Sequence, residues 1–209
     1  MAERHLHEAP PPDSETADRR RAAITAGHSA DPETALRLLD DPEPVVRAAA
    51  LGALARLATL TDEALDTALA DPASEVRRRA LELCVEADRS ATALLDDPDP
   101  QVVEVACWVA GERPGEGDHS VHSLVRIATT HDDPLCRESA VAALGAIGHP
   151  DGRAAVLAGL DDKAPIRRRA VLALAPFKGP EVVAALERAL EDRDWQVRQA
   201  AEDLIGLIG

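Results

Sequence analysis

The chain has 209 residues, of which 45% are hydrophobic and 1% aromatic, and its formal net charge at pH 7 is -15. This length and apolar content suffice for one globular domain or one stacked array. The negative charge argues against a general binder of nucleic-acid phosphates, because such binding depends on Lys and Arg. A core with so few aromatic side chains must be built from Leu, Val, Ile and Ala, which favours packed helices over a β-sandwich or barrel.

The first segment of the chain reads MAERHLHEAPPPDSETADRRR and lacks the apolar run of a secretory signal. We expect a disordered tail over residues 1–16, which show no apolar periodicity. Residues 17–30 are expected to form a degenerate half-repeat that caps the N-terminal end of a helical array. No stretch approaches the ~18 uninterrupted apolar residues of a membrane helix, so we expect a cytoplasmic protein without a membrane partner.

A segment of the form V-R-x-x-A recurs along the rest of the chain. Its arginine position is occupied in turn by Arg47, Arg77, Val103, Arg137, Arg167 and Arg198, at intervals of 26 to 34 residues. A period near 30 that tolerates small slips is typical of two-helix units stacked in a solenoid. The sequence therefore predicts an all-α fold, an α-solenoid (an armadillo-like alpha–alpha superhelix) of about six two-helix repeats over residues 31–209.

Local signals mark where the helices of each unit begin and end. An acidic turn, often Asp-Asp-Pro, separates the two predicted helices, because proline restrains the residue before it and Asp favours a helix N-cap. Gly145, Gly148 and Pro176 are expected to end second helices. The stretch GERPGEGDHS at 111–120 is longer than the other connections and predicts a hinge or flexible loop.

The repeated segments resemble HEAT repeats, particularly the short kind of about thirty residues found in phycobilin-lyase-like proteins and engineered scaffolds. The segments are DDPEPVVRAAALGAL, DPASEVRRRAL, DDPDPQVVEVACWVAG, DDPLCRESAVAALGAIG, DDKAPIRRRAVLALA and EDRDWQVRQAAEDLIG. Armadillo repeats fit less well, because they need a third helix and a longer period. The resemblance is specific for the fold and not for function, since this fold hosts scaffolds, chaperones and a few enzymes.

The resemblance implies a ladder of ion pairs between the turn Asp and the helix Arg. The pairs that it predicts are Asp41 with Arg47, Asp71 with Arg77, Asp161 with Arg167 and Asp192 with Arg198. A ladder of bidentate pairs explains the spacing without a ligand, whereas the alternative makes these arginines anion ligands. Two units depart from the pattern. Val103 occupies the arginine position, so Asp97 is expected to lose its arginine partner. Asp133 lies four residues before Arg137, which predicts a turn two residues shorter.

In proteins similar to this one, second helices line a concave face that binds partners. The partner-binding residues predicted on that face are Gln101, Glu104, Trp108, Leu172, Trp195, Arg78, Arg79, Arg168 and Arg169. Trp and Arg are the residue types that most often anchor interfaces, and the doubled arginines could clamp carboxylates or phosphates. Two alternatives stay open: Trp108 packs between repeats, and the arginines form solvated surface balanced by nearby glutamates.

Few groups converge in a way that predicts catalysis or metal binding. His119 and His122 near Asp118 form the best metal-like cluster, but surface polarity explains them more simply, and we expect no metal and no cofactor. Cys84, Cys107 and Cys136 lie at small apolar positions of the repeat, which predicts core packing. No phosphate-binding loop or nucleophile elbow occurs.

These observations predict a non-enzymatic protein-binding scaffold or adaptor whose preformed concave face binds another protein or a peptide. The second hypothesis is a phycobilin-lyase-like protein that holds a tetrapyrrole or its acceptor subunit. The third and least favoured is a HEAT-like DNA glycosylase, because nucleic acid is not an expected partner of so acidic a chain. The preference for Arg over Lys and the richness in Ala suggest a bacterial source.

Overall fold

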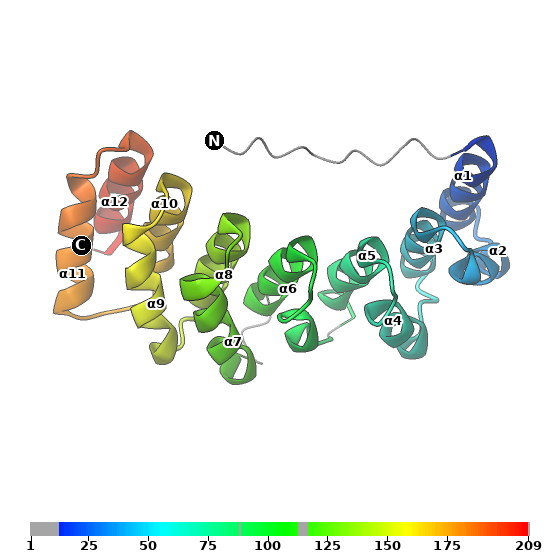
Figure 1. The fold of residues 1–209 in the computed structure, drawn as a ribbon, viewed down its shortest axis with the longest axis horizontal. Coiled ribbons are helices and arrows are strands. Elements are labelled where there is room, and N and C mark those ends of the chain that lie inside the picture. The colour runs from blue at the N-terminus through cyan, green and yellow to red at the C-terminus, as the bar shows by residue number, and fades with distance from the viewer. Residues whose placement is uncertain (1–12, 88, 113–116, 209) are drawn as a thin grey trace. The chain divides into compact units, whose positions relative to one another are not determined.

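The computed structural model describes residues 13–87, 89–112 and 117–208. These ranges contain twelve α-helices and no strand, so the predicted all-α fold is confirmed (Figure 1). The helices are α1 (Ser14–His28), α2 (Pro32–Arg37), α3 (Pro44–Arg56), α4 (Asp62–Leu69), α5 (Ser74–Cys84), α6 (Pro100–Glu112), α7 (Gly117–Thr130), α8 (Pro134–Ile147), α9 (Arg153–Ala158), α10 (Ala164–Ala173), α11 (Pro180–Leu190) and α12 (Trp195–Ile208). Short 3₁₀ turns occur at Leu38–Asp40, Thr92–Leu94, Pro150–Gly152 and Gly159–Asp161.

The chain separates into two compact units, Met1–Ala80 and Leu81–Gly209, with the boundary inside α5. In the first unit, α1 packs against α3, and α2 contacts both of them. Helix α1 begins at Ser14, and Asp13 caps it by accepting a hydrogen bond from the Thr16 backbone N–H at 2.7 Å. Residues 14–16, predicted to belong to the tail, are therefore helical, and Thr16 is buried. Residues 1–12 of that tail lie outside the described residues.

The second unit is a stack of helix pairs in chain order (Figure 1). Its second helices α6, α8, α10 and α12 each pack against the next, while the first helices α7 and α11 pack against α8 and α12. Helix α8 shows why this works: Val141 and Leu144 are fully buried, and Cys136, Ala140 and Ala143 are buried around them at helical spacing. The predicted solenoid architecture is confirmed.

Proline, aspartate and glycine set the ends of α8. Pro134 is its first residue, and the side chain of Asp133 accepts a hydrogen bond from the Leu135 backbone N–H at 2.9 Å. The helix ends at Gly148, whose φ of +67° suits glycine. Gly145 was predicted to end a helix, but it lies inside α8. A Cβ there would come within 2.6 Å of the Ala173 Cα atom, so this glycine serves the close approach of α8 to α10.

The predicted loop over residues 111–120 is largely helical at both ends. Residues 111 and 112 complete α6, and residues 117–120 begin α7. Only residues 113–116 of that stretch lie outside the described residues. Residues 117–120 include Gly, Asp and Ser, which are turn-forming residue types, so the sequence did not signal that a helix begins there.

The cores of both units are built from small and aliphatic side chains. The largest fully buried side chains are Leu, Ile and Val, and many alanines fill the space between them. The three cysteines, Cys84, Cys107 and Cys136, are buried and free of disulfides, which confirms that they pack in the core. No described helix is long and apolar enough to cross a membrane.

Candidate functional site

A ladder of Arg–Asp pairs joins successive repeats, and its pairing differs from the predicted one. Arg167 donates from Nε and Nη2 to both carboxylate oxygens of Asp192, at 2.8 and 2.7 Å, and Asp192 belongs to the following repeat. The same bidentate pair links Arg137 with Asp162 at 2.7 and 3.0 Å. A further bidentate pair joins Arg47 to Asp71, and a single hydrogen bond of 2.8 Å joins Arg19 Nε to Asp41. The predicted pairs, which join an arginine and an aspartate of the same repeat, are therefore wrong, because each of these arginines pairs with an aspartate of the following repeat.

Within its own repeat, each ladder arginine binds the backbone of the acidic turn. Arg47 Nη1 donates to the carbonyl oxygen of Asp41 at 2.9 Å, and Arg77 and Arg198 bind the carbonyl oxygens of Asp71 and Asp192 in the same way. The spacing of six residues between the turn aspartate and the arginine thus brings one edge of the guanidinium to the carbonyl oxygen of that aspartate. The other edge is left to bind the next repeat. In the fifth repeat the ladder uses Asp162 and not the predicted Asp161, since Arg167 Nη1 binds the Asp162 carbonyl oxygen at 2.9 Å.

Each ladder pair stabilises the charged forms of its own arginine and aspartate. The hydrogen bonds from Arg137 hold the pKa of Asp162 below its usual range despite partial burial, and those from Arg167 do the same to the pKa of Asp192. The pairing also raises the pKa of both arginines. Because each guanidinium is engaged on two edges, we assign the ladder to the scaffold and not to ligand binding.

The ladder lacks one rung, between α6 and α8. Val103 takes the arginine position on α6 and is buried, while His131 takes the aspartate position in the following turn. His131 Nδ1 accepts the turn hydrogen bond from the Asp133 N–H at 3.0 Å, and its carbonyl oxygen accepts from Arg137 Nη1 at 2.7 Å. The predicted shorter turn is therefore wrong, because the spacing of six is kept. Val103 cannot pair with Asp97, as predicted, but the Asp97 carboxylate accepts a hydrogen bond from the Asp99 N–H at 2.8 Å.

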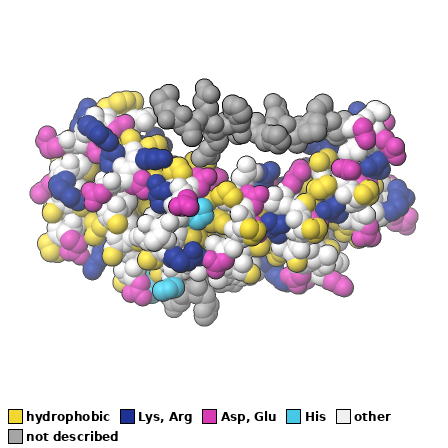
Figure 2. Space-filling view, in the orientation of Figure 1, with side chains coloured by type: hydrophobic (Ala, Val, Ile, Leu, Met, Phe, Trp, Pro, Cys, Tyr) yellow, Lys and Arg dark blue, Asp and Glu magenta, His cyan; other side chains and the backbone are white. Residues whose placement is uncertain are grey.

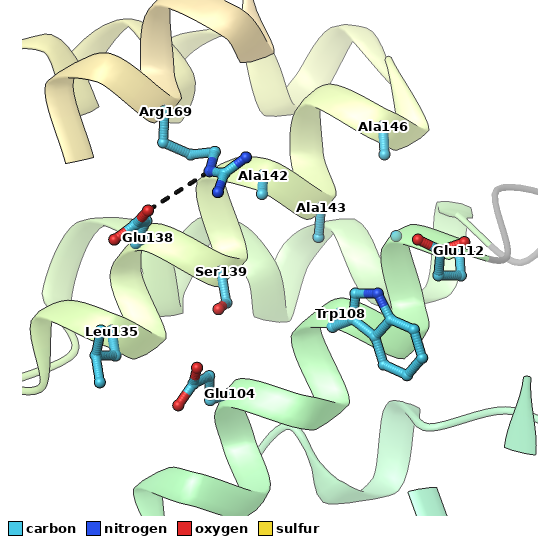
Figure 3. Close-up of a pocket in the computed structure, with 11 residues that line it drawn as sticks. Glu104, Trp108, Glu112, Leu135, Glu138, Ser139, Ala142, Ala143, Ala146 and Arg169 are labelled. Carbon is cyan, nitrogen blue, oxygen red and sulfur yellow. Dashed lines mark ion pairs between the residues drawn. The ribbon is translucent and has the colours of Figure 1, made fainter. Parts of the chain in front are cut away.

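A groove with a volume of about 410 Å³ lies along the second helices of the second unit (Figure 3). It is lined by Glu104, Trp108, Gly111 and Glu112 of α6, by Leu135, Glu138, Ser139, Ala142, Ala143 and Ala146 of α8, and by Arg169 of α10. Alanine and glycine form its floor, because α6 and α8 approach closely. A Cβ on Gly111 would lie 3.0 Å from the Ala143 Cα atom. We call this space the α6–α8 groove.

Three residues of α6 form a stripe along the α6–α8 groove. Glu104, Trp108 and Glu112 are spaced by four residues, so they lie on one face of the helix, and Figure 3 shows the two glutamates on opposite sides of the indole. Trp108 is 45% exposed. Neither Glu104 nor Glu112 forms an ion pair with another described residue. Glu138 differs, because Arg169 Nε lies 3.6 Å from its carboxylate. The groove therefore presents an exposed indole between two glutamates that pair with no described residue.

Three family comparisons bear on this architecture. The profile for HEAT repeats matches residues 87–175, the profile for a single HEAT repeat matches residues 33–60, and the profile for the PBS lyase HEAT-like repeat matches residues 166–192. The chain belongs to the HEAT-repeat family. No curated protein matches it.

Solved structures share the fold of this HEAT-repeat protein at low sequence identity. A designed armadillo repeat protein in complex with the peptide (KR)4 is 17% identical, with a TM-score of 0.50 and coverage of 95% of each chain. An engineered protein is 21% identical, with a TM-score of 0.56 over 93% of this chain and 65% of its own. Human deoxyhypusine hydroxylase in complex with glycerol is 20% identical, with a TM-score of 0.47 over 93% and 80% of the two chains. The likenesses to the designed armadillo repeat protein and to the engineered protein show the fold alone.

The structure brings together only some of the predicted partner-binding residues. Trp108, Glu104 and Arg169 line the α6–α8 groove, whereas the other predicted residues of the second unit, Gln101, Arg168, Leu172 and Trp195, do not. Leu172 and Trp195 are nevertheless exposed, Trp195 by 64%. Arg79 lines a groove of the first unit, and Arg78 lines neither groove.

The sequence prediction missed Glu112, because the Gly- and Pro-rich stretch that contains it predicts a loop. Extending the spacing of four residues from Glu104 and Trp108 by one more turn would have found it. On the surface seen in Figure 2, side chains of both charges mix with hydrophobic ones, so charge composition alone does not reveal the groove.

The cysteines and candidate metal ligands of this HEAT-repeat protein do not form a reactive site among the described residues. Burial raises the pKa of Cys136 to about 11, and its Sγ atom donates to the Pro100 carbonyl oxygen at 3.1 Å. Burial also raises the pKa of Cys107. Among the described residues, no group of three or more His, Cys, Asp and Glu side chains is arranged to hold a metal ion. The side chains of His119 and Asp118, considered as metal ligands, lie outside the described residues.

Proposed function

We propose that this HEAT-repeat protein is a non-enzymatic scaffold that binds a segment of another protein in the α6–α8 groove. One observation carries the proposal: Trp108 stands half-exposed between two carboxylates that pair with no described residue, in a groove of about 410 Å³. Tryptophan is among the side chains that dominate binding energy at interfaces. An exposed tryptophan in a chain with two tryptophans and no tyrosine is thus a natural anchor for a partner.

The groove is preorganised to bind a partner. Its floor consists of small side chains on two helices that touch closely at Gly111 and Ala143, so the floor has little rotamer freedom to lose. Binding to such a surface costs little conformational entropy, and more of the contact energy then appears as affinity.

The charges in the groove define the chemistry of the partner. Successive members of the α6 stripe, Glu104, Trp108 and Glu112, are separated by about 6 Å along the helix axis. Alternate side chains of an extended chain are separated by about 6.8 Å. An extended segment with Lys or Arg at alternate positions can therefore place cations beside both glutamates and a third side chain on the indole, where a cation is also favoured. The designed armadillo protein in complex with (KR)4 supports a basic segment as partner for this architecture.

The two other functions considered fit the groove less well. A tetrapyrrole carries carboxylates and DNA carries phosphates, and both would meet Glu104 and Glu112 with like charge. Arg169, which could offset this repulsion, is already beside Glu138. The acidic lining therefore supports a basic protein segment over either of these ligands.

Tryptophan fluorescence offers a direct test of the proposal. In a Trp195→Phe background, Trp108 reports binding of a basic (KR)4 peptide, with an acidic peptide of equal length as control. We expect the basic peptide to bind and the acidic one to leave the signal unchanged. Labelled-peptide anisotropy should then show at least a tenfold loss for Trp108→Ala, equal to about 1.4 kcal/mol, and for Glu104→Gln/Glu112→Gln.

The matched control is Trp195→Ala, which removes the other tryptophan outside the groove. It should bind the basic peptide as the unchanged protein does. The urea midpoint of each variant shows that the fold is kept. Equal affinity of the Trp108→Ala variant and the unchanged protein would refute the proposal.

A further inference from the structure

The first unit contains a second groove, and its charge is opposite to that of the first. This groove has a volume of about 280 Å³ and is formed by α1, α3 and the first part of α5. It is lined by Arg20, Ile24, His28, Val45, Ala48, Ala49, Gly52, Ala53, Arg56, Glu75 and Arg79. Three arginines and a histidine thus face a single carboxylate, in a chain whose net charge is -15. We call this space the α1–α3 groove.

The basic residues of the α1–α3 groove follow the same helical register as the acidic stripe of α6. Arg20, Ile24 and His28 are spaced by four residues on α1, and they begin one residue after the ladder arginine Arg19. Glu104 likewise comes one residue after Val103, which holds the ladder position on α6. The position that follows the ladder position is therefore basic on α1 and acidic on α6.

Two of these arginines have no partner among the described residues. Arg20 and Arg56 are exposed, and neither forms an ion pair or a side-chain hydrogen bond with any described residue. Arg21, the neighbour of Arg20, differs because it pairs with Asp18 at 2.8 Å on the helix surface. Arg20 and Arg56 therefore present to the groove two guanidiniums that pair with no described side chain.

A glycine makes room for the third arginine. A Cβ on Gly52 would lie 2.7 Å from Nη2 and 3.3 Å from Nε of Arg79, so the guanidinium rests against the bare backbone of α3. Any larger residue at position 52 would push the guanidinium away. The packing of Arg79 on Gly52 holds a positive charge at the floor of the groove.

We propose that the α1–α3 groove binds an acidic protein segment, in which Asp or Glu side chains flank an apolar one. Guanidinium groups match carboxylates in shape and charge, which gives the pairing its preference for Arg. Exposed Ile24 lies between Arg20 and His28 and offers an apolar contact between two basic ones. The stripe extends about 12 Å along α1, a length that suits several residues of an extended segment and exceeds a single small anion.

The test uses the full chain and a fluorescent octapeptide of alternating Glu and Leu, with an octapeptide of alternating Gln and Leu as uncharged control. At low ionic strength we expect the acidic peptide to bind, and the Arg20→Gln/Arg56→Gln variant to lose at least tenfold in affinity. Gly52→Ala should weaken binding as well, because it displaces Arg79. Arg21→Gln, which removes an arginine outside the groove, should bind as the unchanged protein does, and so should Trp108→Ala.

Three results would overturn the proposal. The first is failure of the unchanged protein to bind the acidic peptide, and the second is equal binding by the Arg20→Gln/Arg56→Gln variant. The third is complete displacement of the peptide by inorganic phosphate at the concentration of the peptide itself, which would indicate a site for a free anion. Because the double variant changes only exposed side chains, its urea midpoint should equal that of the unchanged protein. Loss of binding in the α6–α8 groove leaves this test unaffected, since the two grooves share no residue.

Discussion

Replacing Arg167 by Leu should destabilise the second unit by about 3 kcal/mol. The side chains of Arg167 and Asp192 are 7% and 15% exposed, and the guanidinium makes two hydrogen bonds to the carboxylate and one to the Asp162 carbonyl oxygen. Removing one partner of a buried ion pair costs about 3–5 kcal/mol, because the other charge stays buried without compensation. Solvent reaches Asp192 in part, so we place the cost at the lower end of that range. Leucine keeps the apolar stem packing.

Urea unfolding followed by helical circular dichroism measures this cost, and hydrogen exchange locates it. The variant should lose protection first in α10 and α12, the helices that the pair joins. Arg168→Leu is the matched control, since this neighbour forms no ion pair with a described residue and its loss should change stability by less than about 0.5 kcal/mol. In the double variant Arg167→Leu/Asp192→Asn, part of the stability should return, because the orphaned charge is gone and the amide oxygen still accepts from the Asp194 N–H. A loss below about 1 kcal/mol in the single variant, or no recovery in the double variant, would refute the reasoning.

Two further results are expected. Because the pKa values of Asp162 and Asp192 are lowered in the folded state, their stabilising effect is complete above the ordinary Asp pKa of about 3.9 and is lost as the pH falls through the lower folded values. The urea midpoint should therefore hold from neutral pH to about pH 5 and fall below about pH 4, and Asp192→Asn should flatten that fall. Gly145→Ala should cost about 1–3 kcal/mol, since its Cβ would overlap Ala173, whereas Gly206→Ala, where nothing lies within 4 Å, should be neutral or stabilising in the same unfolding assay. Equal effects of the two glycine substitutions would contradict the close packing of α8 on α10.

Much of the fold is predictable from the sequence because the same helix-start and burial signals occur in each repeat. Every copy of the turn and of the V-R segment supplies the same start signal and the same buried positions, so the helix order and period were predictable. The ladder partners were not, because a spacing of six within one repeat looks identical whether Arg47 binds Asp41 or Asp71. Only the separation of adjacent repeats in space decides between them, and one-dimensional spacing does not contain it.

The candidate sites were predictable only in part. Trp108 and Glu104 were found because exposed positions recur with the repeat, and Glu112 was missed because nearby Gly and Pro masked the last turn of α6. The α1–α3 groove was missed for another reason: α1 lacks the V-R signature, so Arg20 and His28 could not be placed in register. The hydrogen bond from Arg19 to Asp41 in the structure sets the register of α1 and so places Arg20 and His28 in the groove.

The absent rung between α6 and α8 bears on how such a chain can be rearranged. A break between α8 and α10 separates Arg137 from Asp162, and one between α10 and α12 separates Arg167 from Asp192. Between α6 and α8, Val103 takes the place of the ladder arginine and His131 that of the ladder aspartate. A break there leaves no charge of a ladder pair without its partner. Repeats inserted, deleted or exchanged at that junction leave every ladder pair intact, and the polar contacts that they break are the exposed Arg126–Asp96 ion pair and the hydrogen bond from Cys136 to the Pro100 carbonyl oxygen. This junction is therefore the natural splice point for building longer or chimeric arrays from this protein.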